Sequence, residues 1–164
     1  MEFTVVQGDI AAQQADALVN AANTGLRMGA GVAGALRSAA GEALNDDAVS
    51  KGPVDLGGVA VTDAYDLDAE YVIHAATMPA GGQATAQSIR DATRNTLARA
   101  DELGCRSLVI PALGTGIAGF SVREGATIIC EEIVAFESEA LDDVRVIAYS
   151  DDAFETIREV AADV

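Results

Sequence analysis

Lysine is nearly absent from this sequence. The ten basic residues are Lys51 and nine arginines, against 26 aspartates and glutamates, and the formal net charge is −16. A surface this acidic repels nucleic acid and anionic membranes, so we expect neither as a partner. The same self-repulsion favours a monomer. Scarce lysine with excess carboxylate is also typical of halophilic proteins, which predicts a protein that works at high salt.

Long apolar runs and paired cysteines are also missing. No stretch approaches the roughly 18 apolar residues that span a bilayer. The start Met1–Thr4 lacks the basic segment and apolar run of a signal peptide, so we expect a cytoplasmic protein. Cys105 and Cys130 have no second cysteine or histidine at metal-ligand spacing, which argues against a zinc site. Scattered cysteines of this kind are usually free thiols.

The 164 residues, half of them hydrophobic, suit one domain with one core. Short β-branched or apolar runs predict strands at Phe3–Val6, Ala17–Val19, Val59–Thr62, Tyr71–His74, Ser107–Ile110 and Val144–Tyr149. Segments with helical spacing predict helices at Val32–Ala40, Ala84–Leu103, Val122–Phe136 and Asp152–Ala162. This alternation predicts a layered α/β domain with a largely parallel sheet, in which ligands bind at the carboxyl ends of the strands.

Two glycine-rich loops each follow a predicted strand and open a helix. They contain Gly29–Gly34 and Gly114–Gly119. Glycine lets a ligand approach the main chain closely, and free N–H groups at a helix start bind anions. The second loop has no lysine or arginine, so we expect neutral backbone donors to hold a phosphate there.

Each loop matches the pattern G-x-G-x-x-G, which also occurs in turns that bind no ligand. A dinucleotide-binding domain would carry this pattern after its first strand, where this chain has Gln7–Ile10 instead. A nucleoside-triphosphate P-loop is excluded because neither loop ends in G-K-[ST]. Two such loops at strand–helix junctions therefore predict a clamp for an anionic group.

Five segments, taken in order, form a more specific pattern than either loop alone. They are Gly8–Ile10, Ala17–Asn23, Gly29–Val32, Tyr71–Ala75 and Pro111–Gly116. This combination resembles the macrodomain family over essentially the whole chain. The resemblance implies a three-layer α/β/α fold around a mixed, mainly parallel sheet of about six strands. It also implies ADP-ribose or an ADP-ribosylated protein as the ligand, with no cofactor and no metal.

The resemblance assigns roles near the two ends of the ligand. Asp9 would accept the exocyclic amine of adenine, with the backbone of Ile10 alongside, although aspartate after a strand is also a common turn residue. Asn23 would hydrogen-bond the distal ribose and position a water, or it would stabilise a turn. Asn20 is a ligand candidate that suits a bracing role in the loop better.

The phosphates and the distal ribose would lie between the loops. The residues implied for them are Gly29, Ala30, Gly31, Val32, Leu113, Gly114, Thr115, Gly116, Ile117, Ala118, Gly119 and Phe120. Val32 and Ile117 would close over the ligand as apolar side chains. Tyr149 or Phe154 would contact adenine, and packing in the core is an equal alternative for either aromatic ring.

Other polar residues receive structural interpretations. His74, the single histidine, ends a strand that reads as buried and has no evident partner, so we predict a structural role rather than catalysis. Arg27 could approach a phosphate, but an exposed loop arginine with no ligand role is the better interpretation. The pairs Asp46–Asp47 and Asp151–Asp152 are predicted to be solvated helix starts, where negative charge is favourable.

Position 33 separates binding from catalysis. One large macrodomain group carries a catalytic aspartate after the glycine–valine of the first loop, whereas this chain has Ala33, which is neither acid nor base. Other archaeal and bacterial macrodomains share GAGVA or GGGVA. Two functions stay open. One is an ADP-ribosyl ester hydrolase that removes ADP-ribose from acidic side chains or deacetylates O-acetyl-ADP-ribose, with substrate-assisted water attack and Asn23 as its catalytic residue. The other is a non-catalytic ADP-ribose-binding module. An RNA-binding domain is disfavoured by the charge.

Overall fold

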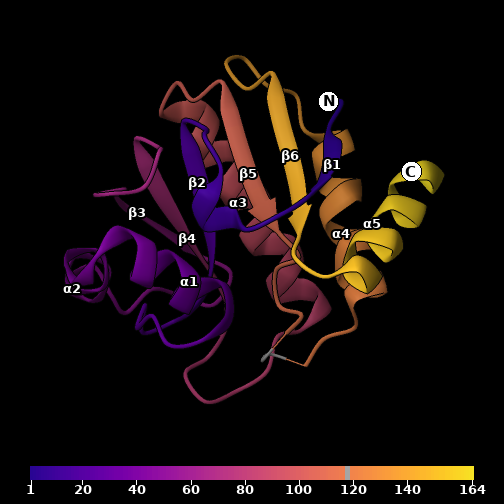
Figure 1. Ribbon diagram of the computed structural model, residues 1–164. Coiled ribbons are helices and arrows are strands. Elements are labelled where there is room, and N and C mark those ends of the chain that lie inside the picture. The colour runs from indigo at the N-terminus through magenta and orange to yellow at the C-terminus, as the bar shows by residue number, and fades with distance from the viewer. Residues whose placement is uncertain (117–118) are drawn as a thin grey trace.

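The computed structural model describes residues 1–116 and 119–164 and has three layers (Figure 1). Its strands are β1 (Thr4–Gln7), β2 (Ala17–Asn23), β3 (Val59–Asp63), β4 (Tyr71–Met78), β5 (Ser107–Pro111) and β6 (Asp143–Ala148). Its helices are α1 (Gly31–Ala40), α2 (Glu42–Ser50), α3 (Ala86–Glu102), α4 (Val122–Ala135) and α5 (Asp151–Asp163), with a short 3₁₀ helix, η1, at Ile10–Ala12.

One mixed sheet forms the middle layer, in the order β1-β6-β5-β2-β4-β3. All neighbouring strands are parallel except β3, which runs antiparallel to β4 at one edge. The carboxyl ends of the five parallel strands therefore lie along one side of the domain. The predicted three-layer α/β/α fold with a mixed, mainly parallel sheet is confirmed.

Alternating side chains of the central strands divide the core into two halves. Leu18, Val72 and Val109 pack with Leu36 of α1 and Leu44 of α2 on one face. The residues next to them in the strands, Val19, Ile73 and Leu108 with Ile110 and Val146, pack against α3, α4 and α5 on the other face. Because successive strand residues point to opposite faces, a strand buried on both sides needs a continuous apolar run.

Helix α2 was not expected from the sequence. The structure places Asp46 and Asp47 inside this helix, so the prediction of a helix start there is wrong, whereas Asp151 and Asp152 do form the first turn of α5. Helix α2 buries only Leu44 and Ala48. Two buried positions in a short segment rich in polar and charged residues give too weak a helical period to be detected.

A row of buried, hydrogen-bonded polar side chains lies on the face of the sheet that α1 and α2 cover. The Asn20 side-chain amide hydrogen-bonds His74 Nδ1 at 3.0 Å, and Thr62 Oγ1 lies 3.0 Å from His74 Nε2. All three side chains are at most 3% exposed. These hydrogen bonds thus join β2, β4 and β3, and the predicted structural role of His74 agrees with this placement.

Within the described ranges, no helix is long and apolar enough to cross a membrane.

Burial lowers the pKa of His74 from its ordinary value of 6.5 to about 4, while Asp47 raises this pKa and Lys51 lowers it to smaller extents. The imidazole of His74 therefore binds a proton below about pH 6.5 in the unfolded chain, but only below about pH 4 in the folded protein. We expect the free energy of unfolding to fall by up to about 1.4 kcal/mol per pH unit between about pH 6 and 5. Urea unfolding at a series of pH values measures this slope, and His74→Gln should flatten it.

A second readout does not need the variant to fold. With one histidine in the chain, the imidazole proton resonance in folded protein is unambiguous and should stay constant from pH 7 to 5. A titration midpoint near 6.5 in the folded state would contradict the buried, neutral ring.

Candidate functional site

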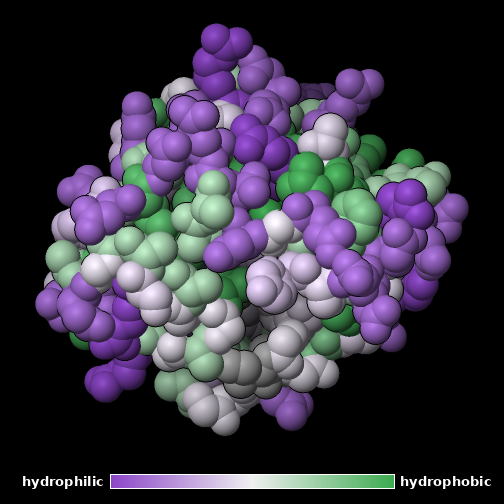
Figure 2. Space-filling view, in the orientation of Figure 1, coloured by the Kyte–Doolittle hydropathy of each residue, from purple (hydrophilic) through white to green (hydrophobic). Residues whose placement is uncertain are grey.

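A cavity of about 630 Å³ opens at the carboxyl ends of the parallel strands. Its lining comes from the ends of β1, β2, β4, β5 and β6 and from the starts of α1, α4 and α5. In Figure 2 hydrophilic residues are frequent at the top and on both flanks of the visible face, while paler and green residues gather in its middle and lower part. Asp9 is the one charged residue among the described lining residues.

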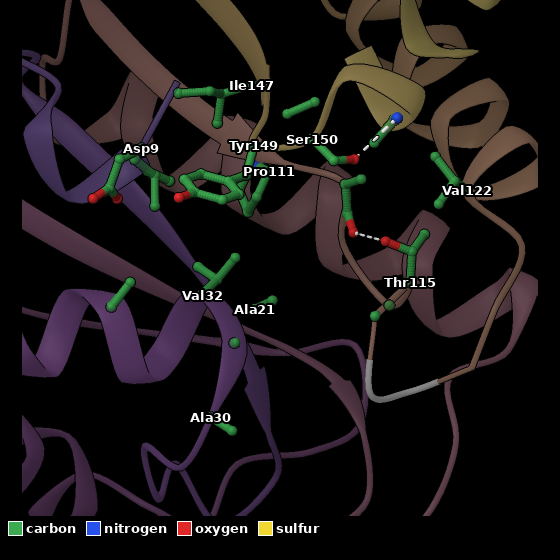
Figure 3. Close-up of a pocket in the computed structure, with 18 of the residues that line it drawn as sticks. Asp9, Ala21, Ala30, Val32, Pro111, Thr115, Val122, Ile147, Tyr149 and Ser150 are labelled. Carbon is green, nitrogen blue, oxygen red and sulfur yellow. Dashed lines mark hydrogen bonds between the residues drawn. The ribbon is translucent and has the colours of Figure 1, made fainter. Parts of the chain in front are cut away.

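The end of the cavity near β1 and β6 carries Asp9 and Tyr149. Asp9 Oδ1 accepts the backbone N–H of Ala11 at 2.9 Å, which caps η1 and leaves the other carboxylate oxygen exposed. Tyr149 is 81% exposed and its ring lies between Asp9 and Val32 (Figure 3). This end therefore combines an acceptor with an exposed aromatic face. Ile10 also lines it.

Tyr149 and Phe154, the two aromatic candidates, lie in different surroundings. Tyr149 lines the cavity, whereas Phe154 packs against the core beneath α5, with Arg158 6.0 Å from its ring centroid. The structure therefore favours Tyr149 over Phe154 for contact with a molecule in the cavity.

The first glycine loop brings the start of α1 to the cavity. Ala30, Gly31 and Val32 line it, and Ala30, the residue before the helix, offers no side-chain acceptor for the first N–H groups. By contrast, hydroxyls of Thr85, Ser121 and Ser150 cap α3, α4 and α5. The first turn of α1 also has no acidic residue. Free N–H groups and the positive end of the helix dipole favour an anion at this point.

The described part of the second glycine loop also borders the cavity. Gly114, Thr115 and Gly116 line it. A Cβ on Gly114 would lie 2.7 Å from Ile89 Cγ1, and its φ of 75° is in the left-handed region, so the tight path of the loop requires glycine. Thr115 Oγ1 donates to Ala112 O at 2.7 Å, and the backbone N–H of Thr115 donates to the same oxygen at 3.4 Å. Ile117 and Ala118 lie outside the described residues.

Several predicted ligand contacts do not line this cavity. Asn20 is 1% exposed and turned to His74, and Leu113 is fully buried in the core. The structure therefore favours the bracing role of Asn20 and gives Leu113 a packing role. Phe120 packs against the core and its N–H donates to Gly114 O, which closes the loop. Gly29 and Gly119 are exposed beside the cavity without lining it.

Asn23 ends β2 near the base of the first loop. Its Nδ2 donates to Arg27 O at 3.2 Å, while its Oδ1 is buried and has no hydrogen-bond partner among the described residues. Neither Asn23 nor the exposed Arg27 is among the described residues that line the cavity. The catalytic role of Asn23 stays a prediction.

Ala33 faces away from the cavity. It is 6% exposed and belongs to the core half beneath α1 and α2, whereas Val32 and Ala35 on the same helix line the cavity. Helical spacing turns neighbouring side chains to different sides, so this position contributes no reactive group here.

Other lining residues were not expected from the sequence. They are Gly8, Ala21, Ala35, Thr77, Met78, Pro111, Ala112, Val122, Ile147, Ala148, Ser150 and Ala153. Most are small or apolar and carry no chemical signal. Their shared feature is position, since Thr77, Met78, Pro111, Ile147 and Ala148 all end parallel strands, where cavities of this fold class lie.

The buried thiols and the carboxylates offer no alternative centre. Burial raises the pKa of Cys105 and of Cys130 to about 11, so both thiols stay protonated near neutral pH. Over the part of the chain that the structure describes, no group of three or more His, Cys, Asp or Glu side chains is placed to hold a metal ion.

Curated relatives share much of this sequence. An uncharacterized protein of Mycobacterium tuberculosis is 46% identical over 129 residues, which cover 79% of this chain but only 36% of that protein. The chain thus matches about a third of that relative's length. An uncharacterized protein of Pyrobaculum aerophilum is 39% identical over 168 residues, covering 98% of this chain and 91% of the relative.

Solved structures share the fold. A variant of the Oceanobacillus iheyensis macrodomain with ADPR is 25% identical, with a TM-score of 0.87 over 97% of this chain and 91% of that one. The Trypanosoma brucei macrodomain in complex with ADP-ribose is 28% identical, with a TM-score of 0.85 over 94% of this chain and 67% of that one. The family model described as Macro domain matches residues 19–129. The chain therefore belongs to the macrodomain family.

Proposed function

We propose that this protein binds ADP-ribose in the cavity between its two glycine loops. The observation that carries the proposal is the uncapped start of α1, which opens into a cavity whose described lining has no cationic side chain. A diphosphate there would accept hydrogen bonds from the N–H groups of Gly31 and Val32 and from the loop at Gly114–Gly116. Similarity to macrodomains solved with ADPR and with ADP-ribose supports the same ligand.

The adenine of the ligand would lie at the opposite end, beside Asp9 and Tyr149. The free oxygen of Asp9 can accept an amine proton, because Oδ1 is already engaged by Ala11. The exposed ring of Tyr149 offers a flat apolar face for a base. Together they favour adenine over a base that presents a carbonyl at the same position.

Hydrolysis of ADP-ribosyl esters is the enzymatic form of this proposal. If water attacks the anomeric carbon, the bond from that carbon to the ester oxygen breaks and the carboxylate leaves. If water adds to the ester carbonyl, the acyl C–O bond breaks, the carboxylic acid forms on the water oxygen and the ribose hydroxyl of ADP-ribose leaves. The substrate's own phosphate would take the water proton, because Asp9 at the adenine end is the single carboxylate of the described lining. The buried, unpaired Oδ1 of Asn23 is an acceptor that a ribose hydroxyl or the attacking water would satisfy after a small side-chain rotation.

A non-catalytic binding module is the second candidate. The buried methyl group of Ala33 favours it, since this position offers no acid or base. In this form the protein would recognise free or protein-linked ADP-ribose without turning it over.

The acidic surface suggests the working conditions. We propose a cytoplasmic monomer that works at high salt and contacts neither nucleic acid nor membranes, and the support is the net charge of −16.

The ligand is tested by calorimetry with ADP-ribose at high salt. We expect saturable one-site binding that Asp9→Asn weakens by about tenfold or more, equivalent to about 1.4 kcal/mol. Asparagine keeps the acceptor that caps η1 but can turn an amide donor toward the adenine amine. The matched ligand is inosine diphosphate ribose, which wild type should bind less well and Asp9→Asn should accept better. Absence of binding by wild type would overturn the proposal.

Catalysis is tested by release of ADP-ribose from glutamate-modified protein. We expect turnover by wild type, and Asn23→Ala should reduce turnover more than affinity because it removes the group that orients water. Equal loss of both would contradict a catalytic role for Asn23. If wild type binds ADP-ribose but releases none from the modified protein, the non-catalytic binding module is the supported function.

Salt should strengthen binding. An anionic ligand approaches a chain of net charge −16 through a cavity without cationic lining, so screening reduces repulsion. Raising KCl from about 0.1 M to about 1 M shortens the Debye length from about 10 Å to about 3 Å. Affinity for ADP-ribose should rise over this range, with uncharged adenosine as control. A steady fall would indicate that cationic side chains hold the phosphates.

A further inference from the structure

The first glycine loop carries little side-chain support of its own. Gly29, Ala30 and Gly31 are exposed, and Gly31 has a φ of 65°. Exposed glycine-rich backbone loses much conformational entropy when it is ordered. N–H groups bind an anion well only when they are already held in place, because ordering them on binding costs affinity. Residues outside the loop must therefore hold its backbone in place.

The residue just before the loop, Met28, is held at both of its backbone polar groups. Its N–H donates to Asn45 Oδ1 of α2 at 2.9 Å, and its carbonyl accepts from Arg37 Nη1 of α1 at 2.6 Å. Its side chain is fully buried in the core half beneath α1 and α2. Both of its hydrogen bonds are made by side chains that come later in the sequence.

Arg37 is itself oriented by Glu42. Its Nε and Nη2 donate to the two carboxylate oxygens of Glu42 at 2.7 and 2.8 Å, a bidentate pair that leaves Nη1 aimed at Met28. The pair raises the pKa of Arg37 and lowers the pKa of Glu42, although both are partly exposed. Gly41, with a φ of 97°, makes the sharp corner between α1 and α2 that brings the two partners together.

The other side of the loop rests directly on α1. A Cβ on Gly34 would lie 2.9 Å from Gly29 O, so glycine at 34 lets the loop backbone lie against the helix. Gly34 N–H also donates to Ala30 O at 3.4 Å. The loop is thus held between Met28 at its start and the first turn of α1 at its end.

We infer that Arg37, Glu42 and Asn45 are positioning residues for the anion-binding loop. They touch no ligand themselves, and they act by fixing the Met28 peptide, so that the N–H groups of Gly31 and Val32 face the cavity before a ligand arrives. This inference rests on the proposed function for the identity of the anion, and its structural half stands without it.

The test compares two single variants with matched controls. Asn45→Ala and Arg37→Gln each remove one bond to Met28. Asn95→Ala removes a comparable amide bond, to Gly57 O at 2.8 Å, and Arg106→Gln removes a comparable ion pair, to Asp142 at 2.7 Å, from the amino end of β5. All are measured for thermal stability, for affinity to ADP-ribose and to adenosine, and for amide hydrogen exchange without ligand.

The expected result is a split between ligands and between regions. Asn45→Ala and Arg37→Gln should lower affinity for ADP-ribose by about tenfold and leave adenosine binding nearly unchanged. They should speed exchange at residues 29–34 with little change in melting temperature. The controls should do neither. Glu42→Gln should weaken ADP-ribose binding in wild type but not in Arg37→Gln, because it acts through Arg37.

Three outcomes overturn the inference. Amide hydrogen exchange at residues 29–34 that is the same in both variants as in wild type would show that the Met28 hydrogen bonds do not hold the loop in place. Equal loss of ADP-ribose and adenosine binding indicates a general structural defect, and ADP-ribose affinity equal to wild type in both variants removes the effect on the ligand. Failure of wild type itself to bind ADP-ribose would overturn the proposed function instead, and faster exchange at 29–34 in the variants alone would still support the anchor.

Discussion

The uncapped first turn of α1 determines what this cavity can hold. The N–H groups of Gly31 and Val32 have no intrahelical acceptor, and Ala30 supplies no side-chain oxygen for them. They lie where five parallel strands end, so sheet and helix converge on the same space. The rest of the fold keeps this turn in place. Leu36 anchors α1 to the sheet, and the Met28 contacts hold the loop before it.

Charge is distributed so that this turn can still attract an anion. The chain carries 26 carboxylate residues, yet the first turn of α1 has none and the described cavity lining has one. Most arginines are engaged elsewhere, as in the pairs of Arg90 and Arg94 with the buried Glu132 between α3 and α4. The cavity therefore relies on oriented peptide groups rather than on cationic side chains, which suits a protein with little positive charge.

The sequence predicted the parts that leave a local pattern. All six strands, the two glycine loops and the start of α5 could be located from apolar runs, glycines and acidic residues, and the family could be identified from motif order. Helix α2 could not, because Leu44 and Ala48 are its only buried residues. The contacts that individual side chains make in the folded protein were also not predictable from the sequence. The sequence favoured a bracing role for Asn20 but did not reveal that its partner is His74. The role of Arg37 and Asn45 at Met28 depends on a corner at Gly41 that spacing does not reveal.

The central claim is that backbone N–H groups of α1 hold the anionic part of the ligand. Amide NMR spectra recorded during titration with ADP-ribose test it directly. The account predicts large, saturable shifts for Gly31 and Val32, together with Gly114 and Gly116, and small shifts for amides at the amino ends of the strands, such as Ser107. Saturable binding that leaves the Gly31 and Val32 amides unshifted would contradict it.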